Sequence, residues 1–83
     1  MTDKILKFSA AWCGPCKQLS MVLKGEDLGV PVEEVDIEAN PELARQYRVR
    51  SVPTMVYVRD EQEVSRITGA QSLDKIRDWA IIQ

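Results

Sequence analysis

Both cysteines of the chain lie in the stretch Trp12-Cys13-Gly14-Pro15-Cys16-Lys17, three positions apart. Residues 5–8 form a short apolar run that predicts a strand, and residues 15–23 have the pattern of a helix. The cysteine pair therefore falls where a strand leads into a helix N-terminus, where unpaired N–H groups and the helix dipole favour negative charge. We expect this placement to lower the pKa of the Cys13 thiol from about 8.5 into the range of about 3.5–7.5 found for activated cysteines.

The residues between the two cysteines suit a small ring closed by a disulfide. Gly14 allows the backbone to turn tightly, and Pro15 suits the first helical turn, where no N–H is needed. The thiol of Cys16 lies close enough to Cys13 to form a disulfide within the geometric limits of that bond.

Two other uses of this spacing are open at this point. A structural zinc site normally takes four nitrogen or sulfur ligands. The chain has two cysteines and no histidine, so carboxylates or a second subunit would have to complete such a site. A purely structural disulfide would close a loop so short that it would restrict the unfolded chain very little. We therefore expect neither a metal nor a cofactor at the cysteines.

Three later segments accompany the cysteine pair: Val-Asp-Ile-Glu-Ala-Asn-Pro at residues 35–41, Ser-Val-Pro-Thr at residues 51–54 and Thr-Gly-Ala at residues 68–70. In this order they strongly resemble the thioredoxin family, and the resemblance extends from Lys4 to the last predicted helix. It implies a thiol–disulfide oxidoreductase in which Cys13 is the nucleophile and Cys16 the resolving cysteine, the two forming a redox disulfide. It also implies a cis peptide bond before Pro53.

The resemblance further implies a substrate-binding groove around the cysteines. Its members would be the apolar rim of the nucleophile, the segment at the cis bond and a loop late in the chain: Trp12, Gly14, Pro15, Val52, Pro53, Gly69 and Ala70. In this arrangement the backbone of Val52 is free to pair with an extended segment of the substrate.

Hydrophobic periodicity and the resemblance together predict one α/β domain over residues 1–83. The expected architecture is a minimal thioredoxin fold: a four-stranded mixed sheet in the order 2-1-3-4, flanked by three helices, without the N-terminal strand and helix of full-length thioredoxins. The predicted strands are residues 4–8, 32–37, 54–59 and 63–68. The predicted helices are residues 15–23, residues 41–47 and a third helix that begins at residue 73.

Four local features complete this prediction. Asn40 and Ser72 are expected to be the N-caps of the second and third helices. Residues 60–62 lack the glycine of the tightest hairpin turns, so we expect a looser loop there. Trp79 falls on the apolar stripe of the last helix and is expected to lie in the core rather than contact a cofactor.

Composition and charge exclude several classes of protein. With 83 residues, a hydrophobic fraction of 45% and a net charge of −2, the chain can build a small core and gives no electrostatic reason to bind nucleic acid. No apolar run approaches the roughly 20 residues needed to span a membrane, and residues 1–4 lack the apolar core of a signal peptide. We expect a cytoplasmic monomer, in a compartment where disulfides are usually transient and catalytic.

Two positions shortly before the cysteine pair depart from the family pattern. Six residues before Cys13, most thioredoxins have a buried aspartate thought to help move the proton of the resolving thiol, and this chain has Lys7. Ser9 stands where a tryptophan is usual. We expect the Lys7 side chain either to run along apolar surface until its ammonium reaches water, or to act on the cysteines from a buried position. In the second case an ammonium would stabilise the thiolates, and a neutral amine would serve as a base.

The sequence thus predicts a general protein disulfide reductase that an NADPH-dependent thioredoxin reductase recharges, with ribonucleotide reductase as a candidate client. Two alternatives stay open. A glutaredoxin-like electron donor, reduced by glutathione, would fit the short length, although Gly14-Pro15 between the cysteines and the absence of a Gly-Gly pair near Gly69 argue against it. In the second alternative, the protein is a non-catalytic binding subunit of a larger enzyme that uses the thioredoxin fold.

Overall fold

The computed structural model describes residues 2–83, which form four strands and three helices. In chain order these elements are β1 (Asp3–Ser9), α1 (Gly14–Leu23), β2 (Val32–Asp36), α2 (Pro41–Gln46), β3 (Thr54–Arg59), β4 (Gln62–Thr68) and α3 (Leu73–Ile81). Every predicted element is present, and the observed ends lie close to the predicted ones. None of the helices in this part of the chain is both long and apolar enough to cross a membrane.

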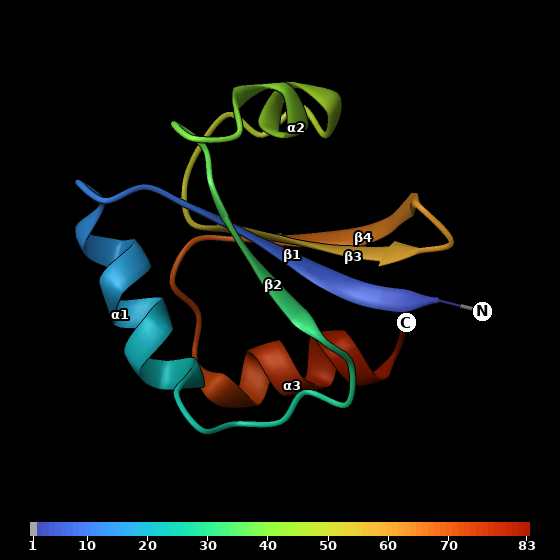
Figure 1. The fold of residues 1–83 in the computed structure, drawn as a ribbon. Helices are drawn as coiled ribbons and strands as arrows, with labels where there is room; N and C mark the ends of the chain where they lie inside the picture. The colour runs from blue at the N-terminus through green and yellow to red at the C-terminus, as the bar shows by residue number, and fades with distance from the viewer. Residues whose placement is uncertain (1) are drawn as a thin grey trace.

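The strands form one mixed sheet in the order β2-β1-β3-β4, which confirms the predicted order. β1 and β2 are parallel, because α1 crosses over between them, and β3 is antiparallel to both β1 and β4. Figure 1 shows α1 and α3 on one side of the sheet and α2 on the other. β1 is therefore an inner strand, and successive side chains along it reach two different layers.

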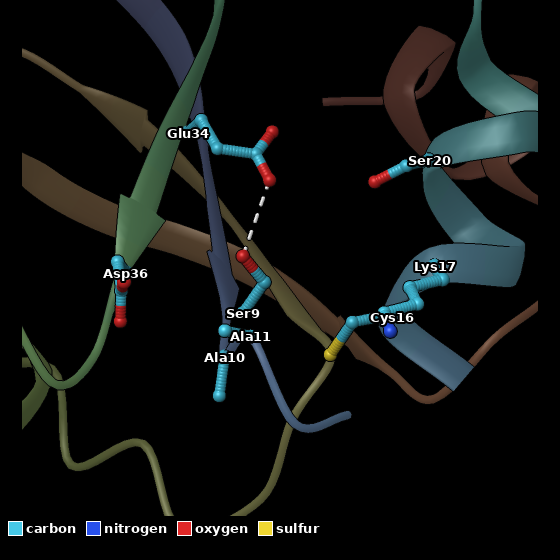
Figure 2. A pocket seen from close by; sticks show the side chains of 8 residues that line it. All are labelled: Ser9, Ala10, Ala11, Cys16, Lys17, Ser20, Glu34 and Asp36. Atoms are coloured by element: carbon cyan, nitrogen blue, oxygen red, sulfur yellow. Dashed lines mark hydrogen bonds between the residues drawn. The ribbon is translucent and has the colours of Figure 1, made fainter. Parts of the chain in front are cut away.

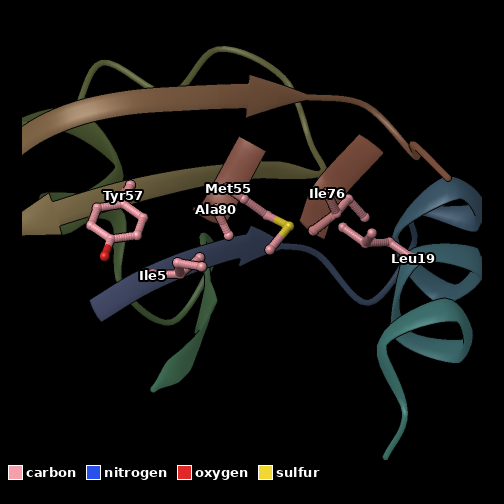
Figure 3. Packing of buried hydrophobic residues seen from close by; sticks show 6 residues of the cluster. All are labelled: Ile5, Leu19, Met55, Tyr57, Ile76 and Ala80. Atoms are coloured by element: carbon pink, nitrogen blue, oxygen red, sulfur yellow. The ribbon is translucent and has the colours of Figure 1, made fainter. Parts of the chain in front are cut away.

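The two layers are filled by two separate apolar clusters. Figure 3 shows the cluster between the sheet and the helices α1 and α3, formed by Ile5, Leu19, Met55, Tyr57, Ile76 and Ala80. The cluster on the α2 side is formed by Leu6, Phe8, Val35, Val56 and Val58. Because Ile5 lies on the α1 side of β1, the side chain two positions later, Lys7, starts on that side too.

The last helix forms as predicted. The side chain of Ser72 accepts a hydrogen bond from the N–H of Lys75 over 3.3 Å, which confirms Ser72 as an N-cap. Trp79 packs against the first cluster, with its ring centroid 6.1 Å from that of Tyr57 in an edge-on arrangement. Its indole N–H donates to Ser65 Oγ over 2.9 Å, so the one polar atom of the ring is satisfied.

Asn40 is the N-cap residue of α2, as predicted, but the expected hydrogen bond from its side chain is not formed. The Asn40 side chain makes no capping hydrogen bond at α2, and its Nδ2 instead donates to the Asp36 carbonyl over 3.2 Å. The side-chain amide therefore binds the backbone at the end of β2. This local hydrogen bond competes with a capping hydrogen bond to the first turn of α2.

The prediction of a loose loop between β3 and β4 is wrong. The strands are joined by the two residues Asp60 and Glu61, which have φ of 52° and 67°. Left-handed backbone at both positions matches the twist of the flanking strands, and Asp tolerates it comparatively well, so the turn closes tightly without glycine.

Candidate active site

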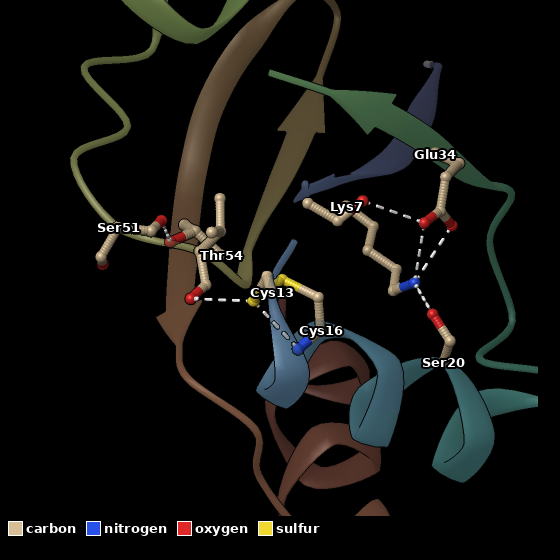
Figure 4. The surroundings of a disulfide bond; sticks show 9 residues. Lys7, Cys13, Cys16, Ser20, Glu34, Ser51 and Thr54 are labelled. Atoms are coloured by element: carbon tan, nitrogen blue, oxygen red, sulfur yellow. Dashed lines mark hydrogen bonds and ion pairs between the residues drawn. A yellow bond between two sulfur atoms is a disulfide. The ribbon is translucent and has the colours of Figure 1, made fainter. Parts of the chain in front are cut away.

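The two cysteines lie at the N-terminus of α1, and Figure 4 shows them joined in a disulfide. Cys13 is the N-cap residue, with extended backbone, and Cys16 lies within the first turn. The N–H of Cys16 donates a hydrogen bond to Cys13 Sγ over 3.1 Å, and the two Cα atoms are 5.3 Å apart. An N–H group that has no partner within the helix thus points at the Cys13 sulfur, which is the arrangement that stabilises a thiolate.

Both sulfurs are covered in this disulfide form. Cys13 is 4% exposed and Cys16 is 3% exposed, because Ala10 and the partly buried Ile37 and Val52 pack against the pair. In the disulfide form the two cysteines are thus covered to nearly the same degree. The helix N-terminus, rather than a difference in exposure, distinguishes the two cysteines.

The segment before β3 lies against the disulfide. The Val52–Pro53 peptide bond is cis, as the resemblance implied, and the Val52 carbonyl oxygen is 3.7 Å from Cys13 Sγ. The N–H of Gly69 donates to the Pro53 carbonyl over 2.8 Å, so the loop after β4 is fastened to the same segment. Of the predicted groove residues, Val52 thus lies beside Cys13, and Gly69 is joined to the adjacent Pro53.

The other predicted groove residues adjoin this site through the chain. Trp12 is 67% exposed and precedes Cys13, and Gly14 and Pro15 are exposed at the start of α1. Ala70 follows Gly69 and is also exposed. The rim next to Cys13 therefore carries one accessible aromatic ring and otherwise small or compact side chains.

Lys7 is buried beneath α1, with 3% of the residue exposed. Its ammonium donates to Ser20 Oγ on α1 over 2.5 Å and to the two carboxylate oxygens of Glu34 on β2 over 3.0 and 3.1 Å (Figure 4). The expectation that the ammonium reaches water is therefore wrong. The neighbouring strand supplies a carboxylate and the helix a hydroxyl, and together they replace the hydration that a buried ammonium loses.

No group of three or more His, Cys, Asp or Glu side chains within residues 2–83 is arranged to hold a metal ion. The reactive groups that the geometry gathers are the two sulfurs of Cys13 and Cys16, with the charged pair of Lys7 and Glu34 close to the same helix.

The family model described as Thioredoxin matches residues 1–81. The chain belongs to the thioredoxin family. A thioredoxin from Mycolicibacterium smegmatis is 44% identical over 73 residues, covering 81% of this chain and 65% of that protein, so the chain spans slightly less than two thirds of this relative. A bifunctional thioredoxin reductase/thioredoxin from Mycobacterium leprae is 40% identical over 73 residues, covering 81% of this chain and 16% of that protein. The solved structure of Fasciola hepatica thioredoxin is 33% identical with a TM-score of 0.85, covering 98% of this chain and 80% of that chain.

Glu34 is the residue of the site that the sequence analysis did not single out. It is the register partner of Lys7 in the parallel pairing of β1 and β2, and its carboxylate also accepts a hydrogen bond from Ser9 Oγ over 3.1 Å. Lys7 and Ser9 both depart from the thioredoxin pattern, and the side chains of both bind this one carboxylate. The signal in the sequence was the acidic residues of segment 32–37, because parallel pairing of the two strands sets Glu34 beside Lys7 on the same face of the sheet.

A pocket of about 380 Å³ opens between α1 and β2, beside the resolving cysteine. It is lined by Ser9, Ala10, Ala11, Cys16, Lys17, Ser20, Glu34 and Asp36. Figure 2 shows Glu34 and Ser20 facing each other across this space, with the sulfur of Cys16 at one end. The Glu34 side chain is 62% exposed. The pocket is therefore open to solvent at the Glu34 carboxylate and is also bordered by Cys16.

Proposed function

We propose that this chain reduces protein disulfides by dithiol–disulfide exchange, with Cys13 as the nucleophile and Cys16 as the resolving cysteine. The observation that carries the proposal is the hydrogen bond of 3.1 Å from the N–H of Cys16 to Cys13 Sγ, at the N-terminus of α1. It supports this assignment because the helix N–H groups and dipole stabilise a thiolate at Cys13, and the thiolate is the attacking form. Membership of the thioredoxin family supports the same reaction.

The reaction proceeds in two exchanges. The Cys13 thiolate attacks one sulfur of the substrate disulfide; a Cys13–substrate bond forms, the substrate disulfide breaks, and the other substrate sulfur leaves as a thiolate that takes up a proton. Cys16 then loses its proton and attacks Cys13 Sγ, which forms the Cys13–Cys16 disulfide and releases the second substrate sulfur, again as a thiolate that is protonated. Two electrons pass from the protein dithiol to the substrate disulfide.

We assign substrate docking to the rim around Cys13, formed by Trp12, Gly14, Pro15, Val52, Pro53, Gly69 and Ala70. The distance of 3.7 Å between the Val52 carbonyl oxygen and Cys13 Sγ supports this assignment. An extended substrate segment that pairs with the backbone of Val52 would bring its disulfide to Cys13 through main-chain hydrogen bonds, independently of the substrate's sequence.

A reductant has to return the Cys13–Cys16 disulfide to the dithiol after each cycle. We infer that an NADPH-dependent thioredoxin reductase does so, and the relative from Mycobacterium leprae, named as a reductase joined to a thioredoxin, supports this pairing. Ribonucleotide reductase is a candidate client of a monomeric reductase of this kind. The cytoplasm, where protein disulfides are usually transient, suits such a cycle.

Turnover of an oxidised protein substrate such as insulin tests the proposal, with NADPH and a thioredoxin reductase in one arm and glutathione in the other. We expect turnover in the first arm and none in Cys13→Ser. Cys16→Ser should accumulate a mixed disulfide between Cys13 and the substrate, which mass spectrometry detects. Faster turnover with glutathione would favour the glutaredoxin-like alternative, and a wild-type protein inactive in both arms would leave the binding-subunit alternative.

A further inference from the structure

Lys7 and Ser9, which both depart from the thioredoxin pattern, share one partner. Lys7 Nζ lies 3.0 and 3.1 Å from the two carboxylate oxygens of Glu34, and Ser9 Oγ donates to Glu34 Oε1 over 3.1 Å. The strand register sets Lys7 directly opposite Glu34. Although the Glu34 side chain is 62% exposed, its carboxylate is therefore fixed by two side chains of β1.

This ion pair is tied to the helix that carries Cys16. Lys7 also donates to Ser20 Oγ over 2.5 Å, and Ser20 lies four residues after Cys16, on the same face of α1. Glu34, Ser20 and Cys16 line one pocket, as Figure 2 shows. Cys13, by contrast, has the Val52 carbonyl oxygen 3.7 Å from its sulfur. The charges of Lys7 and Glu34 thus lie on the Cys16 side of the disulfide.

We propose that Lys7 and Glu34 form a tuning pair, whose opposed charges set how readily the Cys16 thiol becomes a thiolate and hence the balance between disulfide and dithiol. Both are positioning residues, since they act on the sulfur through the electric field across the pocket. The ammonium stabilises a thiolate at Cys16 and the carboxylate destabilises it. The inference rests on the proposed disulfide reduction and deepens it, because Cys16 must ionise before it can release the substrate.

The other charges near Cys16 are less protected from solvent. Lys17 on α1 and Asp36 on β2 line the same pocket, and Lys24 and Glu26 line the adjoining pocket with Lys7 and Glu34. Lys17, Lys24 and Glu26 are exposed and Asp36 is half-buried, whereas Lys7 is 3% exposed. Water and salt screen exposed charges most strongly, so Lys7 supplies the least screened charge, and Glu34 offsets it while the ion pair is intact.

Removal of one charge at a time should act in opposite directions. In Glu34→Gln the ammonium keeps its charge without a counter-charge, so the pKa of the Cys16 thiol should fall. In Lys7→Met the carboxylate remains alone, so that pKa should rise. One unit charge across a partly hydrated pocket corresponds to a shift of about half a pKa unit or more. In the double variant the two changes should offset, and the pKa should return toward the value of the unchanged protein.

The pKa of Cys16 is measured by thiolate absorbance against pH in the full chain with Cys13→Ser, where Cys16 is the remaining thiol. Four proteins are compared in this background. One carries Cys13→Ser alone, and the others add Glu34→Gln, Lys7→Met or both substitutions. With both cysteines present, the disulfide–dithiol equilibrium is then measured in glutathione redox buffers, where a tenfold change in the constant is about 30 mV. Glu34→Gln should shift this equilibrium toward the dithiol, and Lys7→Met should shift it toward the disulfide.

Glu33→Gln is the matched control, because Glu33 lies on the same strand but its side chain starts on the opposite face and pairs with Lys4 over 3.7 Å. It should leave the Cys16 pKa unchanged, and Asp36→Asn, in the same pocket but without a contact to Lys7, should shift it less than Glu34→Gln does. Shifts of the same sign in Glu34→Gln and Lys7→Met, or an equal shift in either control, would overturn the tuning pair.

Two features keep this test decisive. If Glu34→Gln fails to fold because it leaves a buried ammonium without its counter-charge, the comparison of Lys7→Met with the double variant still isolates the carboxylate. The Cys16 pKa should then fall when Glu34 is replaced, and an unchanged or higher pKa would refute the inference. The titration uses no client protein, so its result is independent of the insulin assay. The tuning pair can therefore be refuted in a protein that reduces insulin, and supported in a protein that does not.

Discussion

The N–H of Cys16 donates its hydrogen bond to the sulfur of Cys13 over 3.1 Å, so the backbone of α1 links the two residues in addition to their disulfide. That N–H group lies at the positive end of the helix dipole, so it would stabilise a thiolate formed at Cys13 on reduction. Cys16 instead lines a pocket that also holds the carboxylate of Glu34. The two sulfurs therefore have different electrostatic surroundings although they are three residues apart.

This difference predicts unequal reactivity of the two thiols. In the reduced protein at neutral pH, iodoacetamide should modify Cys13 roughly tenfold faster than Cys16 or more, since a pKa lower by about one unit gives that ratio of thiolate fractions. Quenched samples analysed by fragmentation mass spectrometry give the two rates. The urea-unfolded protein is the control, in which both cysteines should react alike. Equal rates in the folded protein, or a faster Cys16, would contradict the assignment of nucleophile and resolving cysteine.

The helix that carries the cysteines is anchored by Leu19, which is 1% exposed in the cluster with Ile5, Met55 and Ile76. Leu19→Ala should lower the free energy of unfolding by about 2–5 kcal/mol, because it removes buried methyl groups and leaves a cavity. Met21 lies on the same helix but is 79% exposed, so Met21→Ala should change the free energy by less than about 0.5 kcal/mol. Urea denaturation of both variants measures the contrast, and similar losses would show that α1 is not packed as described.

The tight turn between β3 and β4 is a site for stabilisation. Glu61 has φ of 67°, and left-handed backbone costs a residue with a side chain roughly 1–2 kcal/mol. Glu61→Gly relieves this cost but adds freedom to the unfolded chain, so a net gain of about 0.5 kcal/mol is expected. Thermal or urea denaturation measures it, with Glu61→Ala as a control that keeps the steric cost. A loss of stability in Glu61→Gly would indicate a different backbone at this turn.

Stability at low pH should depend on Asp3. Arg59 donates two hydrogen bonds to its carboxylate, over 2.9 and 3.0 Å, and the Tyr57 hydroxyl donates one over 2.7 Å. These hydrogen bonds lower the pKa of Asp3 below its ordinary value, and those from Arg59 have the larger effect. Because the folded pKa lies below the unfolded value of about 3.9, the stabilisation is present above that pH and lost as the pH falls through the folded pKa.

We therefore expect the difference in unfolding free energy between the wild type and Asp3→Asn to be constant from about pH 5 to 7 and to shrink below about pH 4. Urea denaturation across this range measures it. In an Arg59→Gln background the same comparison should depend less on pH, because the main cause of the lowered pKa is gone. A difference that does not vary with pH in the wild-type background would rule out this role of the Asp3 carboxylate.

Local sequence was sufficient for the elements and for the position of the cysteine pair. The apolar runs at residues 4–8 and 54–59 became β1 and β3, and the apolar positions of the last helix, including Ile76, became its buried face. Such patterns succeed because neighbours along the chain decide whether a segment buries one face with the period of a strand or of a helix. The helix N-terminus at Cys13 followed in the same way, since it depends only on where α1 begins.

Contacts between distant segments determined the surroundings of that pair. Lys7 and Glu34 are 27 residues apart, and only the register of β1 against β2 sets the carboxylate opposite the ammonium. A long charged side chain ends in water unless a partner meets it, and no local pattern contains that partner. The burial of Cys13 has the same origin, because Val52 and Ile37 reach the disulfide from other parts of the chain.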